Sequence, residues 1–203
     1  YLKHHAQTTP DREAVVFGEQ RLNYAELHTQ VRQCAKALLA MNIKKGDRVA
    51  VLCTARIEYW VVFLATTSIG AIWLGLNPKY RLQECRYVLE DARPTVLFAM
   101  AEFEGRCYQE TVDTVQKDYG FVTQVIALTT LMPGTLSFSD FLALSDTVSD
   151  QMISDRQSQV ERLDPALLVY TSGSTGKPKG ALLSHYGLCF GSTVQNQHFL
   201  VKQ

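Results

Sequence analysis

The chain has 203 residues, a formal net charge of zero and 46% hydrophobic residues. A chain of this length and composition can bury one sizeable core, with or without an extension. The balanced charge argues against nucleic acid as a partner, and no block of like charges marks a solvated tail.

Five cysteines are scattered singly along the chain and form no C-x-x-C pair: Cys34, Cys53, Cys85, Cys107 and Cys189. An odd number of cysteines without a paired framework indicates reduced thiols, as in a cytoplasmic protein. Most of them fall at apolar positions of helical or strand patterns, so we expect them to be buried as small hydrophobic side chains.

The first elements are a helix end, a hairpin and a capped helix. Residues 1–7 form the end of a predicted helix, and residues 14–17 and 21–23 form a predicted hairpin across a short turn. Asn23 then caps a second helix, with Glu26 three residues later completing a capping box. One face of this helix is apolar at helical spacing: Leu27, Val31, Cys34, Ala35, Leu38 and Leu39.

Strands and helices then alternate as far as residue 128. The run at residues 48–53 is apolar almost throughout, which is typical of a strand buried on both faces. Strands that alternate with helices predict an α/β fold with a doubly wound, mostly parallel sheet. Predicted strands occupy residues 48–53, 71–76, 95–99 and 121–128, and predicted helices occupy residues 57–69, 82–92 and 104–119.

The uncharged stretch from Tyr59 to Pro78 is a candidate membrane span. Hydroxyl residues and glycines interrupt it, however, so a helix that ends near Gly70 and a buried strand after it explain the pattern better. We therefore predict no membrane span. Trp60 and Trp73, which lie within this stretch, are predicted to belong to the core.

Residues 129–163 are less regular, with a short helix expected at residues 138–142. We divide the chain into an N-terminal α/β subdomain, residues 1–163, and the start of a second, incomplete subdomain, residues 164–203. The second part contains a glycine-rich hairpin and then a predicted helix over residues 185–199.

A loop rich in glycine and hydroxyl residues separates two apolar runs, residues 166–169 and 181–183, which we predict to be paired strands. Its glycines permit positive φ angles and close approach of a ligand, and its hydroxyls supply donors. Lys177 and Lys179 supply positive charge, and successive backbone N–H groups can form an anion-binding nest. The loop therefore predicts a polyphosphate site. Its sequence is Tyr170-Thr171-Ser172-Gly173-Ser174-Thr175-Gly176-Lys177-Pro178-Lys179-Gly180.

Two other interpretations of this loop are a solvated connection and a Walker A loop. Glycine, serine and threonine favour turns, so the loop could be a solvated connection between two strands. A Walker A loop requires the pattern G-x-x-x-x-G-K-[ST]. Gly173 and Gly176 are too close together for that pattern, and Pro178 occupies the position of its magnesium-binding hydroxyl.

The complete string resembles the phosphate-binding signature of the adenylate-forming superfamily, which includes acyl-CoA synthetases, luciferases and the adenylation domains of peptide synthetases. That signature is two hydroxyl residues, glycine, two more hydroxyl residues, glycine, any residue, proline, lysine and glycine. Residues 171–180 match it at every position. Residues 21–27, 45–51, 70–73 and 76–80 resemble the family less specifically, and the acyl-CoA synthetase branch fits best.

The resemblance implies that the full-length protein is an AMP-forming ligase. It would use ATP and Mg²⁺ to convert a carboxylic acid, a fatty or other organic acid, to an acyl-adenylate and pyrophosphate, and would then transfer the acyl group to coenzyme A. The family's residues for adenine, ribose, magnesium and its catalytic lysine come later in the sequence, so no catalytic residue and no metal ligand is assigned here. The residues implied to hold the β- and γ-phosphates are Thr171, Ser172, Gly173, Ser174, Thr175, Gly176 and Lys179.

The chain lacks an initial methionine and begins within a predicted helix, so we expect a fragment that is inactive by itself. Two alternatives stay open: a nucleotide- or phosphate-binding module without ligase activity, and a phosphotransferase with an unusual loop. His185 and Cys189 lie one helical turn apart, but two ligands do not make a metal site, and we expect His185 to pack beneath the loop or to help position it. The sequence indicates small-molecule partners, no nucleic acid and a cytoplasmic location, and assigns no oligomeric state.

Overall fold

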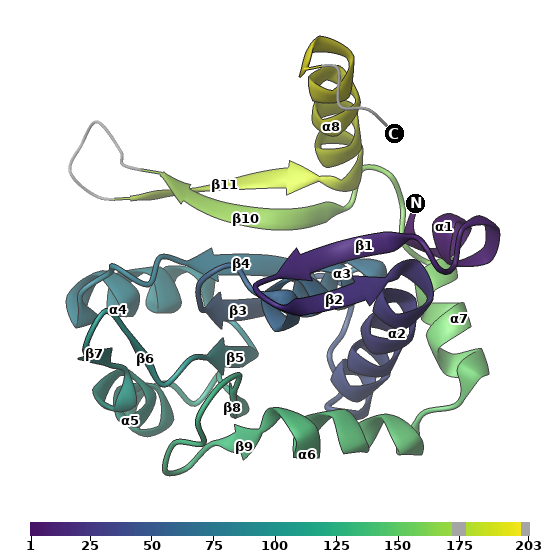
Figure 1. Ribbon diagram of the computed structural model, residues 1–203. Coiled ribbons are helices and arrows are strands. Elements are labelled where there is room, and N and C mark those ends of the chain that lie inside the picture. Colours follow the sequence, from purple (N-terminus) through teal and green to yellow (C-terminus); the bar gives the residue numbers. More distant parts are fainter. Residues whose placement is uncertain (172–177, 200–203) are drawn as a thin grey trace.

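The computed structural model describes residues 1–171 and 178–199 of the chain (Figure 1). Its main sheet has seven strands in the order β11-β10-β4-β3-β5-β8-β9. These strands are β3 (Arg48–Leu52), β4 (Ile72–Leu76), β5 (Val96–Ala99), β8 (Gln124–Ala127), β9 (Leu136–Ser137), β10 (Pro165–Thr171) and β11 (Lys179–Ser184). Two small hairpins are formed by β1 (Glu13–Phe17) with β2 (Gln20–Asn23) and by β6 (Glu102–Phe103) with β7 (Arg106–Cys107). The helices are α1 (Leu2–Thr8), α2 (Tyr24–Ala40), α3 (Ile57–Ser68), α4 (Leu82–Ala92), α5 (Gln109–Asp118), α6 (Phe138–Ala143), α7 (Asp150–Ser158) and α8 (His185–Phe199), with a 3₁₀ turn η1 (Leu144–Thr147).

The sheet is doubly wound and mostly parallel, as predicted. Every neighbouring pair from β10 to β9 is parallel, and β11 alone joins the sheet antiparallel, as the partner of β10. The chain moves from β3 to β4 in one direction along the sheet and from β4 to β5 in the other. Because such crossovers are right-handed, α3 and α4 lie on opposite faces, where α3 packs against α2 and α4 packs against α5.

The centre of the sheet is the core of the molecule. In β3, which pairs with β4 and β5, the four residues from Val49 to Leu52 are fully buried, as predicted for this strand. The predicted apolar face of α2 is also confirmed, with Leu27 and Leu38 among its buried residues. The capping box at the start of α2 is present, because Asn23 Oδ1 accepts from the Glu26 N–H at 2.8 Å and Glu26 Oε2 accepts from the Asn23 N–H at 2.9 Å.

The helix predicted at residues 104–119 begins later, at Gln109. Its first residues instead form the hairpin β6–β7, whose turn, Glu104-Gly105, has positive φ angles of 49° and 77°. Two positive φ angles are what a two-residue hairpin turn requires, and they are incompatible with a helix. Arg106 follows this turn. Its guanidinium donates to the carbonyls of Lys79 and Tyr80, just before α4, at 2.9 and 2.7 Å.

Two expectations about buried side chains were partly wrong. Cys107 lies in the β6–β7 hairpin and Cys189 on α8, and both are exposed, whereas the three other cysteines are buried. Trp73 is buried as predicted, but Trp60 on α3 is 41% exposed and stacks on Phe63. Hydrophobicity alone therefore did not separate the core side of α3 from the side that faces α8.

The last three elements of the chain, β10, β11 and α8, lie at the β11 end of the sheet. β10 and β11 form the predicted hairpin, and α8 starts at His185 as predicted, with the Ser184 hydroxyl accepting from the Gly187 N–H at 3.2 Å. β10 is bonded to β4 within the main sheet, and the division between residues 163 and 164 stays a prediction. None of the helices in the described part of the chain has the length and apolarity that a membrane crossing requires.

Candidate phosphate-loop site

The candidate site is the end of the β10–β11 hairpin. Thr171 is the last residue of β10 and pairs with Lys179, the first residue of β11, and both are exposed. They are the two predicted phosphate-binding residues whose placement the structure describes. The other five, Ser172, Gly173, Ser174, Thr175 and Gly176, lie outside the described residues.

Strand direction places this end of the hairpin at the carboxyl edge of the sheet. β10 runs parallel to β4, with Leu167 opposite Trp73 and Leu168 opposite Leu74. Thr171 therefore extends beyond Leu76, where β4 ends. In open α/β sheets, ligands bind outside the carboxyl ends of the parallel strands, so the hairpin presents its loop where this architecture places ligands.

Helix α4 holds both strands of the hairpin next to the loop (Figure 1). The Tyr170 hydroxyl, one residue before Thr171, donates to the Asp91 carboxylate. The Tyr87 hydroxyl donates to the Pro178 carbonyl at 3.1 Å, one residue before Lys179. These two bonds fix the described residues on either side of the loop to one rigid helix, which positions the loop relative to the sheet.

Tyr170 is held in its neutral, hydrogen-bond-donating form. Burial raises the pKa of its phenol most, and the hydrogen bond to Asp91, the charge of Asp91 and the nearby Tyr87 raise this pKa further. A phenol that keeps its proton can continue to donate to the carboxylate at any pH at which the protein would work. The bond to Asp91 is therefore a constant structural link.

The glycine that follows Lys179 is explained by the same tyrosine. Gly180 lies directly opposite Tyr170 in the hairpin. A Cβ atom at position 180 would come within 3.0 Å of Leu168 Cδ1 and 3.2 Å of Tyr170 Cζ. The absence of a side chain at Gly180 thus makes room for the ring that reaches α4.

The comparisons with known proteins agree with this geometry. A family model described as AMP-binding enzyme matches residues 2–202. The chain belongs to this family. YngI of Bacillus subtilis (strain 168), provisionally named an acyl-CoA synthetase, is 30% identical over 203 residues, which are 92% of this chain and 37% of YngI. The mitochondrial medium-chain acyl-CoA ligase ACSF2 of Homo sapiens is 30% identical over 206 residues, 93% of this chain and 33% of ACSF2.

A solved structure shares the fold. The anthranilate CoA ligase AuaEII, in complex with anthranoyl-AMP, matches with a TM-score of 0.78 at 23% identity, over 91% of this chain and 34% of that chain. The AMP-binding family member described here thus spans about a third of the length of the relatives named above. The resemblance inferred from residues 171–180 is therefore confirmed at the level of the family and of the fold.

A cavity of about 380 Å³ lies beside the hairpin of this AMP-binding domain, at the carboxyl ends of β3 and β4. Its wall includes Tyr59, Trp73 and Tyr170, together with Cys53 directly after β3. Burial raises the pKa of the Cys53 thiol to about 11, so this thiol stays protonated near neutral pH and is not a nucleophile. The cavity is an aromatic pocket without a reactive group at Cys53.

The sequence did not predict the partners of the loop, and it misplaced His185. Tyr170 was expected only to pack, and no pattern pointed to Asp91 or Tyr87, which are 79 and 91 residues distant from their partners. His185 does not lie beneath the loop, because it follows Ser184 at the opposite end of β11. No group of three or more His, Cys, Asp or Glu side chains in the described ranges, 1–171 and 178–199, could hold a metal ion.

Proposed function

We propose that the full-length protein is an AMP-forming acyl-CoA ligase. It converts a carboxylic acid and ATP to an acyl-adenylate and pyrophosphate, and then transfers the acyl group to the thiol of coenzyme A. The observation that carries this proposal is a complete phosphate-binding signature on a hairpin held at the carboxyl edge of a parallel sheet. The names of YngI and ACSF2, and the anthranoyl-AMP bound to AuaEII, support the same chemistry.

The loop acts on the leaving group of the first step. A carboxylate oxygen attacks the α-phosphorus of ATP, and the bond from this phosphorus to the oxygen that bridges to the β-phosphate breaks. Negative charge therefore grows on the departing pyrophosphate. The Lys179 ammonium, the Thr171 hydroxyl and the loop from Ser172 to Gly176 hold the β- and γ-phosphates and stabilise that charge, and the hydrogen bonds to α4 keep the hairpin in place meanwhile.

Magnesium and coenzyme A enter the proposal without residues of this chain. Mg²⁺ prefers oxygen ligands and is commonly held by one or two carboxylates together with phosphates of the substrate. Among the described residues no group of three or more His, Cys, Asp or Glu side chains could hold a metal ion, and no step is assigned to the metal. We propose a cytoplasmic location on the basis of the unpaired cysteines, whereas the relative ACSF2 is named as a mitochondrial protein. We also propose that residues 164–203 begin a second subdomain.

The test is acid-dependent exchange of pyrophosphate into ATP by the full-length protein, with a panel of straight-chain and aromatic carboxylic acids. We expect Lys179→Ala to lower the turnover number about a hundredfold, since one preorganised charge facing the leaving group contributes about 3 kcal/mol. The Michaelis constant for the acid should change little. Lys117→Ala, on α5, is the matched control and should behave as the wild type.

Each other outcome identifies a different function. Wild-type exchange by Lys179→Ala at saturating ATP would show that the lysine does not face the leaving group. Release of ADP instead of pyrophosphate and AMP would indicate a phosphotransferase. ATP binding without exchange for any acid in the panel would indicate a nucleotide-binding module without ligase activity.

A further inference from the structure

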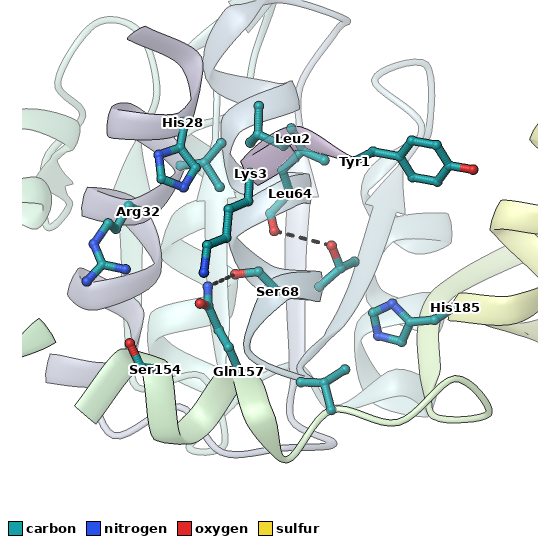
Figure 2. A pocket seen from close by; sticks show the side chains of 13 residues that line it. Tyr1, Leu2, Lys3, His28, Arg32, Leu64, Ser68, Ser154, Gln157 and His185 are labelled. Carbon is teal, nitrogen blue, oxygen red and sulfur yellow. Dashed lines mark hydrogen bonds between the residues drawn. The ribbon is translucent and has the colours of Figure 1, made fainter. Parts of the chain in front are cut away.

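A second cavity, of about 550 Å³, lies at the opposite end of β11 from the phosphate loop, between α1, α2, α3 and α7 (Figure 2). This volume is in the range of pockets that bind small molecules. None of the residues that line it is used in the ligase steps proposed above. We call it the α1–α7 cavity. Its polar lining consists of Lys3, His28, Arg32, Thr67, Ser68, Ser154, Gln157 and His185.

The lining of the α1–α7 cavity is basic. Lys3 extends from α1 into the space between His28, Ser68 and Gln157, and Arg32 lies beside it on α2 (Figure 2). No acidic side chain lines the cavity, and within the described ranges no carboxylate lies within ion-pair distance of the Lys3 ammonium. The pKa of His28 is lowered by burial and then by the charges of Arg32 and Lys3, which agrees with a positive field in the cavity.

One carboxylate, that of Asp150, balances part of this charge. Asp150 at the start of α7 accepts from Arg32 at 3.0 Å and from Lys36 at 2.8 Å. Arg32 shares Asp150 with Lys36, which lies outside the lining, and Lys3 has no such partner among the described residues, so the two cations of the lining are not fully neutralised. Lys3 and Arg32 can each donate to a different oxygen of one phosphate group.

The opposite wall offers a polar atom that lacks a partner. Nε2 of His185 is buried and has no hydrogen-bond partner among the described residues. The ring lies across the cavity from Arg32 (Figure 2). Burial lowers the pKa of His185, so the ring is neutral and one of its nitrogens is a donor. The Ser68 hydroxyl and the Gln157 amide, which donates to it at 3.4 Å, add further polar groups to the cavity. A buried polar atom without a partner has a free-energy cost that a ligand atom can relieve.

We propose that the α1–α7 cavity is a binding site for a small organic phosphate monoester, held through its dianionic phosphate by Lys3 and Arg32 and through a hydrogen bond with His185. The apolar part of the ligand contacts the rest of the lining, which consists of Tyr1, Leu2, Val31, Leu64 and Val160. The site is separate from the phosphate loop, because the six residues of β11 span about 20 Å between Lys179 and His185. It does not depend on the proposed ligase function.

The experiment follows the ring resonances of His28 and His185 in full-length protein with labelled histidines, assigned with His28→Gln and His185→Gln. The probes are phenyl phosphate, inorganic phosphate and benzoate, which has a similar apolar body with a single charge. Phenyl phosphate should shift both resonances, bind more tightly than benzoate and raise the pKa of His28, because a nearby anion favours the imidazolium over the opposing charges of Arg32 and Lys3.

Three variants separate this site from the phosphate loop and from general surface charge. Lys3→Ala should weaken binding about fivefold or more, since a unit charge at contact distance attracts the dianion even through solvent. Lys117→Ala should have no effect, and Lys179→Ala, which removes the loop lysine, should leave the His28 shift unchanged. Resonances that do not move with millimolar phenyl phosphate, or an equal affinity in Lys3→Ala, would overturn the proposal. Equal binding of benzoate would overturn the assignment of a dianion.

Discussion

The hydrogen bond from Tyr170 to Asp91 makes a specific prediction about ATP. Tyr170→Phe removes only the hydroxyl, since the ring can remain against Gly180. Hydrogen bonds to a charged partner contribute about 1.5–3 kcal/mol, and Asp91 is exposed, so we take the lower value of about 1.5 kcal/mol. If all of this free energy holds the hairpin in its binding position, Tyr170→Phe should raise the Michaelis constant for ATP about tenfold. If half of it does so, the rise should be about threefold.

The assay is pyrophosphate exchange by the full-length protein at varied ATP and then at varied acid. Only the Michaelis constant for ATP should rise, because the bond positions the phosphate loop. Tyr119→Phe is the matched control, since the Tyr119 hydroxyl donates at 2.8 Å to Glu90 on the same helix, at a place that does not contact the hairpin. Asp91→Asn, which keeps an acceptor without the charge, should have an intermediate effect. An unchanged Michaelis constant in Tyr170→Phe, or an equal rise in Tyr119→Phe, would refute the reasoning.

Three further predictions concern packing, thiols and the chain itself. Gly75→Ala should lower the free energy of unfolding by about 1–3 kcal/mol and alter tryptophan fluorescence, because the new Cβ would lie 2.6 Å from Cη2 of the buried Trp73. An unchanged melting temperature would contradict this prediction. Cys107 and Cys189 should react with a thiol reagent in the native protein while the three buried cysteines react only after unfolding, which mass spectrometry can measure. The 203-residue chain alone should show no acid-dependent pyrophosphate exchange, and measurable exchange would show that its site is complete.

Local signals in the sequence were sufficient for most of the fold. The capping box at Asn23 and the buried strand β3 each depend on a few adjacent residues, and both were found where the pattern placed them. One exception was the region before α5, where the turn Glu104-Gly105 interrupts an apparently helical stretch. A single glycine in such a stretch is compatible with either structure, and the long-range bonds of Arg106 to the segment before α4 help to stabilise the hairpin.

The candidate site, too, could be predicted from the sequence only where its signals are local. The signature marked Thr171 and Lys179 as the residues at the ends of the loop, because their spacing and chemistry are local. The anchoring of the loop depends on which strand lies next to β10, and no local pattern encodes that this neighbour is β4, the strand before α4. Asp91 and Tyr87 were therefore beyond the reach of sequence reasoning.

Gly180 shows why motif positions require a structure for their interpretation. From the sequence, each glycine of the loop was taken to permit close approach of a ligand. The structure gives Gly180 a different neighbour, the Tyr170 ring, which must cross this position to place its hydroxyl against Asp91. Glycine at the end of the signature and tyrosine just before its start are thus two parts of one anchoring device. Its effect on phosphate binding is indirect, through the position of the hairpin, whereas Lys179 is placed to act directly on charge.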